Sequence, residues 1–248
     1  MLIKFICCDV FTRIACDLVS KSPHCIDLEF VPMLMHEKPE NLKHYIRDII
    51  EKSTDESARK YDALILGFGL CGNAVIGLTC PIPMVIPRSH DCCTLHMGSK
   101  EGFIASFGDT LSSRWCSTGY FERSAMLRND YFLTDQLENY KTSKEYMGYL
   151  EQYDEEMADY LWKTLHPQRE SKEAVYIKID GFEYSDSLER FRSSQEEAGI
   201  SVREVAGDIS MLKDLINGEW DEDRFLTIPP GKKIEGVYDM DVVMQAGD

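Results

Sequence analysis

Three of the nine cysteines stand at the ends of apolar runs that are typical of buried strands. They are Cys8 at the end of the run 3–8, Cys71 after the run 61–67 and Cys92 after the run 83–87. In an open parallel sheet, ligands bind beyond the carboxyl ends of the strands, so we expect these thiols to converge there. Thiolates bind soft and borderline metals, and the pattern therefore predicts a metal site. His36 follows another predicted strand and is a candidate for the same site.

Four of the other six cysteines, at positions 16, 25, 80 and 116, are interpreted as packing or incidental residues, because free cysteine is a common small hydrophobe in protein cores. The remaining two are secondary candidates, each beside a better one. Strand alternation turns Cys7 away from the side that Cys8 faces, and Cys93 stands beside the better candidate Cys92. The same alternative, a set of buried thiols without a metal, stays open for the three candidates. The six are Cys7, Cys16, Cys25, Cys80, Cys93 and Cys116.

The segment 67–72 (GFGLCG) leaves its predicted strand with three glycines, Gly67, Gly69 and Gly72. Glycine permits positive φ and close approach of the backbone to a ligand, so we expect this loop to present Cys71 and backbone N–H groups to the site. A dinucleotide-binding fingerprint would follow the first strand, with an acidic residue about 20 positions on, and neither condition is met. A plain tight turn is the alternative interpretation.

The segment 87–92 (PRSHDC) is the densest polar cluster and follows an apolar strand. Here His90 is a candidate to bind metal or move protons, and Asp91 to orient it or to cap the following helix. Arg88 is a candidate to hold an anionic substrate through paired N–H donors. The structural alternative is that Arg88 and Asp91 pair only with one another and that His90 is an ordinary loop histidine.

The composition limits the classes of partner. The chain has 248 residues and a net charge of −16, which opposes the broad phosphate contacts that nucleic acids and anionic membranes offer. The apolar run at the N-terminus is too short for a signal peptide, and no later run approaches the roughly 20 apolar residues of a membrane span. We therefore expect a cytoplasmic protein, where a reducing environment argues against a disulfide framework.

Apolar periodicity predicts an α/β fold, a doubly wound parallel sheet with a helical insertion and a second, smaller α/β unit. Residues 1–111 form the N-terminal α/β domain with the cysteine site, 112–170 an acidic and aromatic helical connector, and 171–248 the C-terminal α/β unit. The expected strands are 3–8, 26–34, 61–67, 83–87, 174–179, 200–205 and 224–228, and the expected helices are 11–20, a segment opened by Pro39, 185–198 and 211–216.

These motifs together resemble a bacterial and archaeal family catalogued as a domain of unknown function, number 1638. The matching segments are Cys8-Asp9, Met35-His36 with Pro39, the run Leu66 to Gly72, Ile86-Pro87-Arg88 with His90-Asp91-Cys92, Gly98-Ser99, and Gly207-Asp208 with Leu212, Gly218 and Trp220. The family usually has an acidic residue near Thr12 and Arg13, so a role for that carboxylate does not carry over.

The resemblance implies a one-carbon metabolic context, because family members are often encoded near corrinoid-dependent methylamine methyltransferases in anaerobes. It implies a small-molecule substrate, methylated or thiol-containing, and a corrinoid protein or methyltransferase as partner. The recurrent residues that it carries over are Cys8, His36, Cys71, Arg88, His90, Asp91 and Cys92.

Three functions compete. The first is a zinc-thiolate protein of corrinoid-linked methyl transfer, since three protein ligands leave a fourth position for a substrate thiol. The second is an iron-sulfur protein for electron transfer or redox sensing, although the chain lacks the closely spaced cysteines usual for cubane clusters. The third is a non-catalytic corrinoid-binding or partner-binding module, although a DxHxxG signature is absent. The residues alone leave open whether the protein is an enzyme.

Overall fold

The computed structural model describes residues 1–33, 35, 38–57, 59–108, 114–125, 144–151, 153–165, 173–183, 186–237 and 242–247. Its main sheet has five strands, with neighbours in the order β2 (Cys25–Val31), β1 (Leu2–Cys8), β3 (Ala63–Gly67), β4 (Met84–Pro87) and β8 (Phe225–Ile228). The first four strands are parallel and β8 is antiparallel to β4. The predicted α/β class is confirmed.

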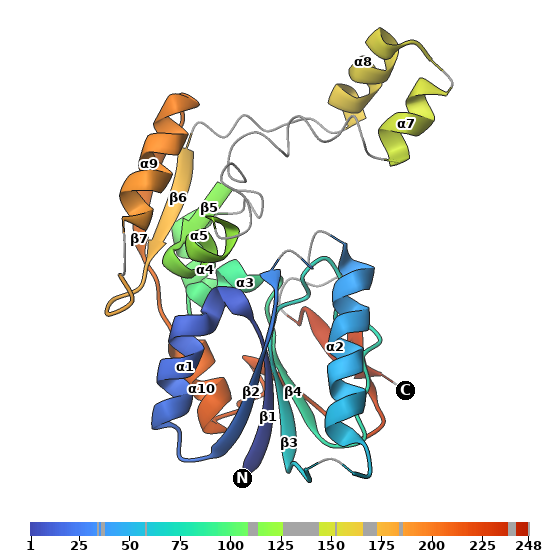
Figure 1. Ribbon diagram of the computed structural model, residues 1–248, viewed down its shortest axis with the longest axis vertical. Helices are drawn as coiled ribbons and strands as arrows, with labels where there is room; N and C mark the ends of the chain where they lie inside the picture. The colour runs from blue at the N-terminus through green and yellow to red at the C-terminus, as the bar shows by residue number, and fades with distance from the viewer. Residues whose placement is uncertain are drawn as a thin grey trace.

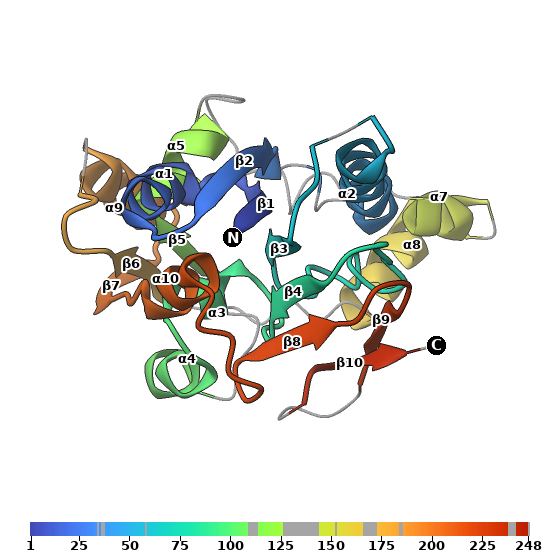
Figure 2. The same cartoon turned by 90° about the horizontal axis from the view of Figure 1, so that it is seen from below.

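Helices cover both faces of the main sheet (Figures 1 and 2). Helix α1 (Thr12–Lys21) lies with α10 (Ser210–Asn217) on one face, and α2 (Pro39–Thr54) lies on the other. Pro39 suits the first turn of α2, where its missing N–H costs no hydrogen bond. Leu42, Ile46 and Ile49 follow helical spacing and are buried, which fixes the face of α2 that packs on the sheet.

A second, parallel sheet consists of β5 (Arg114–Ser117), β6 (Glu173–Lys178) and β7 (Ser201–Ala206), with α5 (Thr118–Ala125) and α9 (Ser187–Glu197) beside it. The two sheets do not follow the boundaries predicted at 111 and 170. Strand β5 comes from the range predicted as a connector, and β8 returns from the C-terminal range to the main sheet. The described part of the connector also contains α7 (Lys144–Leu150) and α8 (Glu155–Leu165).

Short elements complete the described fold. A 3-10 turn, η1 (Asp9–Phe11), follows β1, while α3 (Cys92–His96) and α4 (Lys100–Phe107) follow β4. Strands β9 (Lys233–Gly236) and β10 (Met244–Gly247) form an antiparallel pair near the C-terminus.

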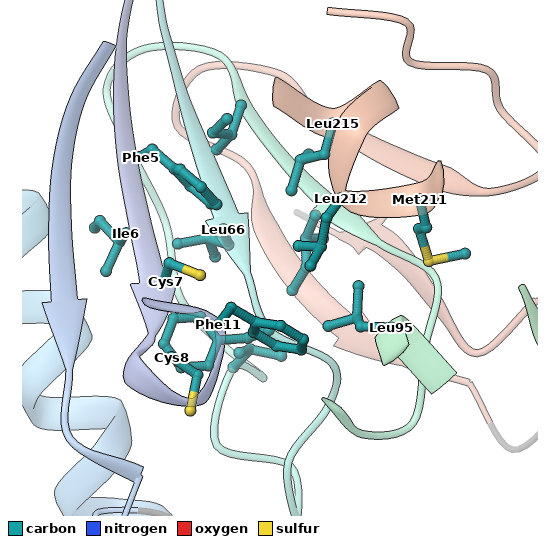
Figure 3. Close-up of a cluster of buried hydrophobic side chains, with 14 of the residues drawn as sticks. Phe5, Ile6, Cys7, Cys8, Phe11, Leu66, Leu95, Met211, Leu212 and Leu215 are labelled. Atoms are coloured by element: carbon teal, nitrogen blue, oxygen red, sulfur yellow. The ribbon is translucent and has the colours of Figure 1, made fainter. Parts of the chain in front are cut away.

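One hydrophobic cluster extends through both sheets. It contains Leu66 of β3, Leu95 of α3 and Leu212 of α10 (Figure 3). Val175 and Ile177 of β6 belong to the same cluster. The two sheets therefore share a core at the carboxyl edge of the main sheet, where the candidate site lies. Among the described helices, none is long and apolar enough to cross a membrane.

Candidate metal centre

Three of the candidate residues stand at the carboxyl ends of three adjacent strands. Cys8 is the last residue of β1, Cys71 follows β3, and Cys92 opens α3 after β4. The order β2-β1-β3-β4 is that of a flavodoxin-like sheet. In such a sheet the direction in which successive strands are added reverses between β1 and β3, which is the switch point. Ligands of such sheets bind in the crevice at that switch point, and Cys8 and Cys71 stand on its two sides.

The loops that leave β3 and β4 run side by side. The N–H of Leu70 donates to the carbonyl of Ser89 at 2.9 Å, and the N–H of Cys71 donates to the carbonyl of His90 at 3.0 Å. Glycine permits this approach, because a Cβ at Gly69 would lie 2.6 Å from the nitrogen of Asp91 and 2.8 Å from the oxygen of Ser89. These contacts place Cys71 beside the segment that carries His90 and Cys92.

The backbone turns sharply at Cys71. Cys71, Gly72 and Asn73 have φ values of 46°, 68° and 70° in succession. Left-handed conformations are costly for residues with a Cβ and tend to persist at functional sites. Gly72 also faces the start of α2, since a Cβ there would lie 3.1 Å from the Cγ of Pro39. The predicted glycine loop therefore presents Cys71 from a strained turn.

The three thiols influence one another. Burial raises the pKa of Cys71 to about 12. Burial also raises the pKa of Cys8 and of Cys92, and repulsion from a thiolate at Cys71 adds to both shifts, with Cys8 adding to that of Cys92. Backbone N–H groups of η1, at Val10 and Asp9, act in the opposite direction on Cys8. The thiols thus lie within electrostatic range, and each disfavours a second bare thiolate beside it.

The described side chains do not form a closed set of ligands. Among them, no three His, Cys, Asp or Glu residues are arranged to hold one ion. Cys8 is buried, whereas Cys71 and Cys92 keep part of their surface exposed. His36 lies outside the described residues.

His90 and Asp91 have different surroundings. The carboxylate of Asp91 caps α3, accepting the N–H of Thr94 at 3.1 Å, and burial raises its pKa. The predicted helix cap at Asp91 is therefore present. The Nε2 atom of His90 and the Oγ atom of Ser89 are buried and have no hydrogen-bond partner among the described residues.

Hydrogen bonds from Arg88 join the loop after β4 to the C-terminal segment, here the residues from Glu222 to Met244 that the structure describes. Its Nε donates to the carbonyl of Glu222 and its Nη1 to the carbonyls of Val242 and Met244, at 2.9, 2.9 and 2.5 Å. The guanidinium is therefore held by backbone carbonyls, and the alternative that Arg88 and Asp91 pair only with one another is wrong. Anion binding by Arg88 stays a prediction. The Nη2 atom takes no part in these three hydrogen bonds.

His96 was assigned no role from the sequence, and the structure places it beside Cys92. Its Nδ1 lies 2.8 Å from the carbonyl oxygen of Cys92, so Nδ1 carries the proton and donates to that oxygen. Its Nε2 then accepts a hydrogen bond from the Ser117 hydroxyl at 3.0 Å. Ser117 in turn accepts the N–H of Tyr120 at 3.2 Å. Burial lowers the pKa of His96 to about 4, which keeps the ring neutral.

These hydrogen bonds, from Cys92 through His96 to Ser117, are called the His96 relay and connect Cys92 to the second sheet. The spacing of Cys92 and His96, four residues apart on one helix, was the available signal, whereas nothing in the sequence indicated Ser117. A small cavity of about 10 Å³ adjoins the relay, large enough for about one water. Its lining includes Arg13, His96, Ser117 and Gly119.

The remaining cysteines fall into two groups. Figure 3 shows Cys7 pointing into the core near Phe5 and Leu66, while Cys8 points away beyond the end of the strand, as alternation predicts. Of these six cysteines, four are buried and two are exposed. The buried ones are Cys7, Cys80, Cys93 and Cys116, and the exposed ones are Cys16 and Cys25.

Comparison with known proteins gives one match. A family model described as "Protein of unknown function (DUF1638)" matches residues 30–216. Neither the curated proteins nor the solved structures include a significant match to the chain. The matched range contains the glycine loop, the segment 87–92 and α3.

Proposed function

Because the chain belongs to the DUF1638 family, whose description names no reaction, we propose a function from the site: a metal-thiolate centre at Cys8, Cys71 and Cys92. The observation that carries the proposal is the meeting of three thiols, from three adjacent strand ends, within electrostatic range of one another. Convergence from positions so distant in sequence has no packing requirement behind it, since an aliphatic side chain would fill the same space.

A cation removes the electrostatic cost of this arrangement. Burial and mutual repulsion oppose thiolates at Cys8, Cys71 and Cys92, and a bound divalent ion reverses both effects. The ion must draw the thiols together on binding, because the described side chains are not already arranged as a ligand set. The partly exposed Cys71 and Cys92 give it a route from solvent.

The donor chemistry favours zinc. Three sulfur donors suit soft or borderline metals and do not suit magnesium or calcium, which require oxygen ligands. An iron-sulfur cluster is the second candidate, supported by the same thiols and by no additional contact. In the cytoplasm, where we place the protein, the cysteines stay reduced and able to bind metal.

The proposed biological role is in corrinoid-linked one-carbon metabolism. A zinc ion held by thiolates lowers the pKa of a thiol that binds to it, which makes the thiol a nucleophile at neutral pH. A thiol is therefore the class of methyl acceptor that we propose for this centre, with a corrinoid protein or methyltransferase as the partner. The support for the partner is the family resemblance alone.

Anaerobic purification followed by elemental analysis and absorption spectroscopy tests the proposal. We expect a colourless protein with about one zinc per folded chain. A brown protein containing iron and sulfide would replace zinc with the iron-sulfur alternative, and a pink one would indicate a bound corrinoid. Protein that neither contains metal nor takes up zinc on reconstitution would refute the metal centre.

A further inference from the structure

The imidazole of His90 has a buried nitrogen that pairs with none of the described residues. Its Nε2 makes no hydrogen bond to any residue in the described part of the chain. Leaving a buried polar atom unpaired costs about 1–3 kcal/mol, and native proteins usually satisfy such atoms with protein, water or an ion. The position of this nitrogen therefore calls for a ligand.

Backbone contacts bring His90 next to the thiols. Its carbonyl accepts the N–H of Cys71 at 3.0 Å, which places His90 directly across from that residue. It also precedes Cys92 by two positions in the loop that leaves β4. His90 thus neighbours two of the three proposed ligands, on the loop after β4 that Gly69 allows to contact the loop after β3.

The neighbouring polar side chains are worse candidates for a metal ligand. Asp91 caps α3 and Arg88 is bound to carbonyls of the C-terminal segment. The Oγ of Ser89 also has no partner in the described part of the chain, but it lies near Gly69, where a Cβ would come within 2.8 Å of it. A neutral hydroxyl is besides a poor ligand for a thiolate-rich zinc site, whereas imidazole is a preferred one.

We propose that His90 binds the metal through Nε2 and completes a Cys3His ligand set with Cys8, Cys71 and Cys92. The inference rests on the proposed thiolate centre and assigns the fourth position of the resting ion, from which an entering substrate thiol would displace the imidazole. It also chooses His90 over His36, which the sequence pattern had placed in the same crevice.

Cobalt substitution tests the assignment in the full chain. Co²⁺ is added anaerobically to metal-free wild type and to His90→Ala and His36→Ala variants, and the visible and near-ultraviolet spectra are compared. We expect tetrahedral d–d bands and thiolate charge transfer in the wild type. His90→Ala should keep the charge transfer but shift the d–d bands and weaken Co²⁺ binding at least 10-fold, while His36→Ala should match the wild type.

The failures of the two proposals differ. A wild type without thiolate charge transfer would overturn the metal centre itself. A His90→Ala spectrum and affinity equal to those of the wild type would leave the centre in place and overturn the role of His90, assigning its nitrogen to water. The same shift in His36→Ala alone would give the fourth position to His36.

Discussion

At the scale of single residues, the central point is that Cys8, Cys71 and Cys92 are thiols with raised pKa values in one small region. Burial holds each of them neutral in the metal-free protein, and repulsion from a thiolate at Cys71 adds to this effect at Cys8 and Cys92. A metal that displaces their protons would convert this unfavourable grouping into a stable one. The role of each cysteine should therefore appear in metal content rather than in folding.

We predict that Cys71→Ser lowers metal content far more than Cys80→Ser. Both residues lie between β3 and β4, but Cys71 stands in the strained turn at the site and Cys80 is buried in the core cluster. A serine hydroxyl is a hard, weakly acidic group and does not replace a thiolate. Bound zinc per folded chain is the measurement, and equal stoichiometry in the two variants would make Cys71 an ordinary loop cysteine.

Arg88→Lys should destabilise the fold by about 2 kcal/mol, since hydrogen bonds from charged groups contribute about 1.5–3 kcal/mol and a single ammonium cannot reach three carbonyls. Urea denaturation measures the loss. The control is Arg47→Lys, whose ion pair with Glu51 is exposed and should contribute at most about 0.5 kcal/mol. Equal midpoints for the two variants would exclude the fastening role of Arg88.

Residue types and positions alone could predict Cys8, Cys71 and Cys92 as neighbours, because strand ends in a parallel sheet share an edge. The partners of Arg88 and His96 could not be predicted in this way. Arg88 binds backbone carbonyls more than 130 residues away, and a carbonyl has no sequence signature. Ser117 pairs with His96 only because a second sheet, whose position the sequence does not encode locally, packs against α3.

At the scale of elements, the site depends on two loops in unusually close contact. Gly69 lies against the backbone of the loop after β4, and this spacing brings Cys71 beside His90. A helix of only five residues, α3, then carries Cys92 at its start and His96 at its end. Helix α3 therefore connects the thiol site to the second sheet.

Gly69→Ala should destabilise the protein by about 1–3 kcal/mol, because a methyl group 2.6 Å from a backbone nitrogen forces the loops apart. Metal content should fall with it, since Cys71 moves with the loop. Gly148→Ala in α7 is the matched control, as no atom of the described residues lies within 4 Å of its Cβ position, and it should be neutral or slightly stabilising. A Gly69→Ala protein with wild-type stability and metal content would contradict this account.

The His96 relay predicts a pH dependence of stability. The pKa of His96 is about 4 in the fold and about 6.5 in an unfolded chain, so only the unfolded chain takes up a proton between these values. The free energy of unfolding of the metal-free protein should fall by about 3 kcal/mol at most as pH drops from about 6.5 to about 4, with no contribution above that window.

Urea midpoints at several pH values measure this slope in wild type and in His96→Asn. The variant should lose most of the His96 contribution, whatever its absolute stability. His44→Asn, on the exposed face of α2, is the control and should retain the wild-type slope. An unchanged slope in His96→Asn would mean that the ring is not held neutral by the fold.

Most elements of both sheets were predictable because their residues carry strong periodicity. The strand 61–67 and the helix opened by Pro39 correspond closely to β3 and α2. Strand β5 was missed because RWCS is short and lacks alternation, and it pairs with β6 across a long insertion. The antiparallel β8 was expected as a strand, but local pattern does not specify which sheet a strand joins.

At the scale of the whole molecule, a shared core holds the two sheets around the carboxyl edge of the larger one. Val175 and Ile177 of the second sheet belong to the same cluster as Leu66 and Leu95. The net charge of −16 adds a negative field that attracts divalent cations and repels nucleic acids. The net negative charge is therefore compatible with the cation that we propose at this edge.

X-ray absorption at the zinc edge of zinc-loaded wild-type protein shows which atoms bind the ion. We expect a four-coordinate ion with three sulfur neighbours at about 2.3 Å and one nitrogen neighbour at about 2.0 Å. Cys71→Ser, used as the reference, should reduce the sulfur shell or prevent zinc binding. A first shell composed only of nitrogen and oxygen would contradict the thiolate centre and place zinc elsewhere on the protein.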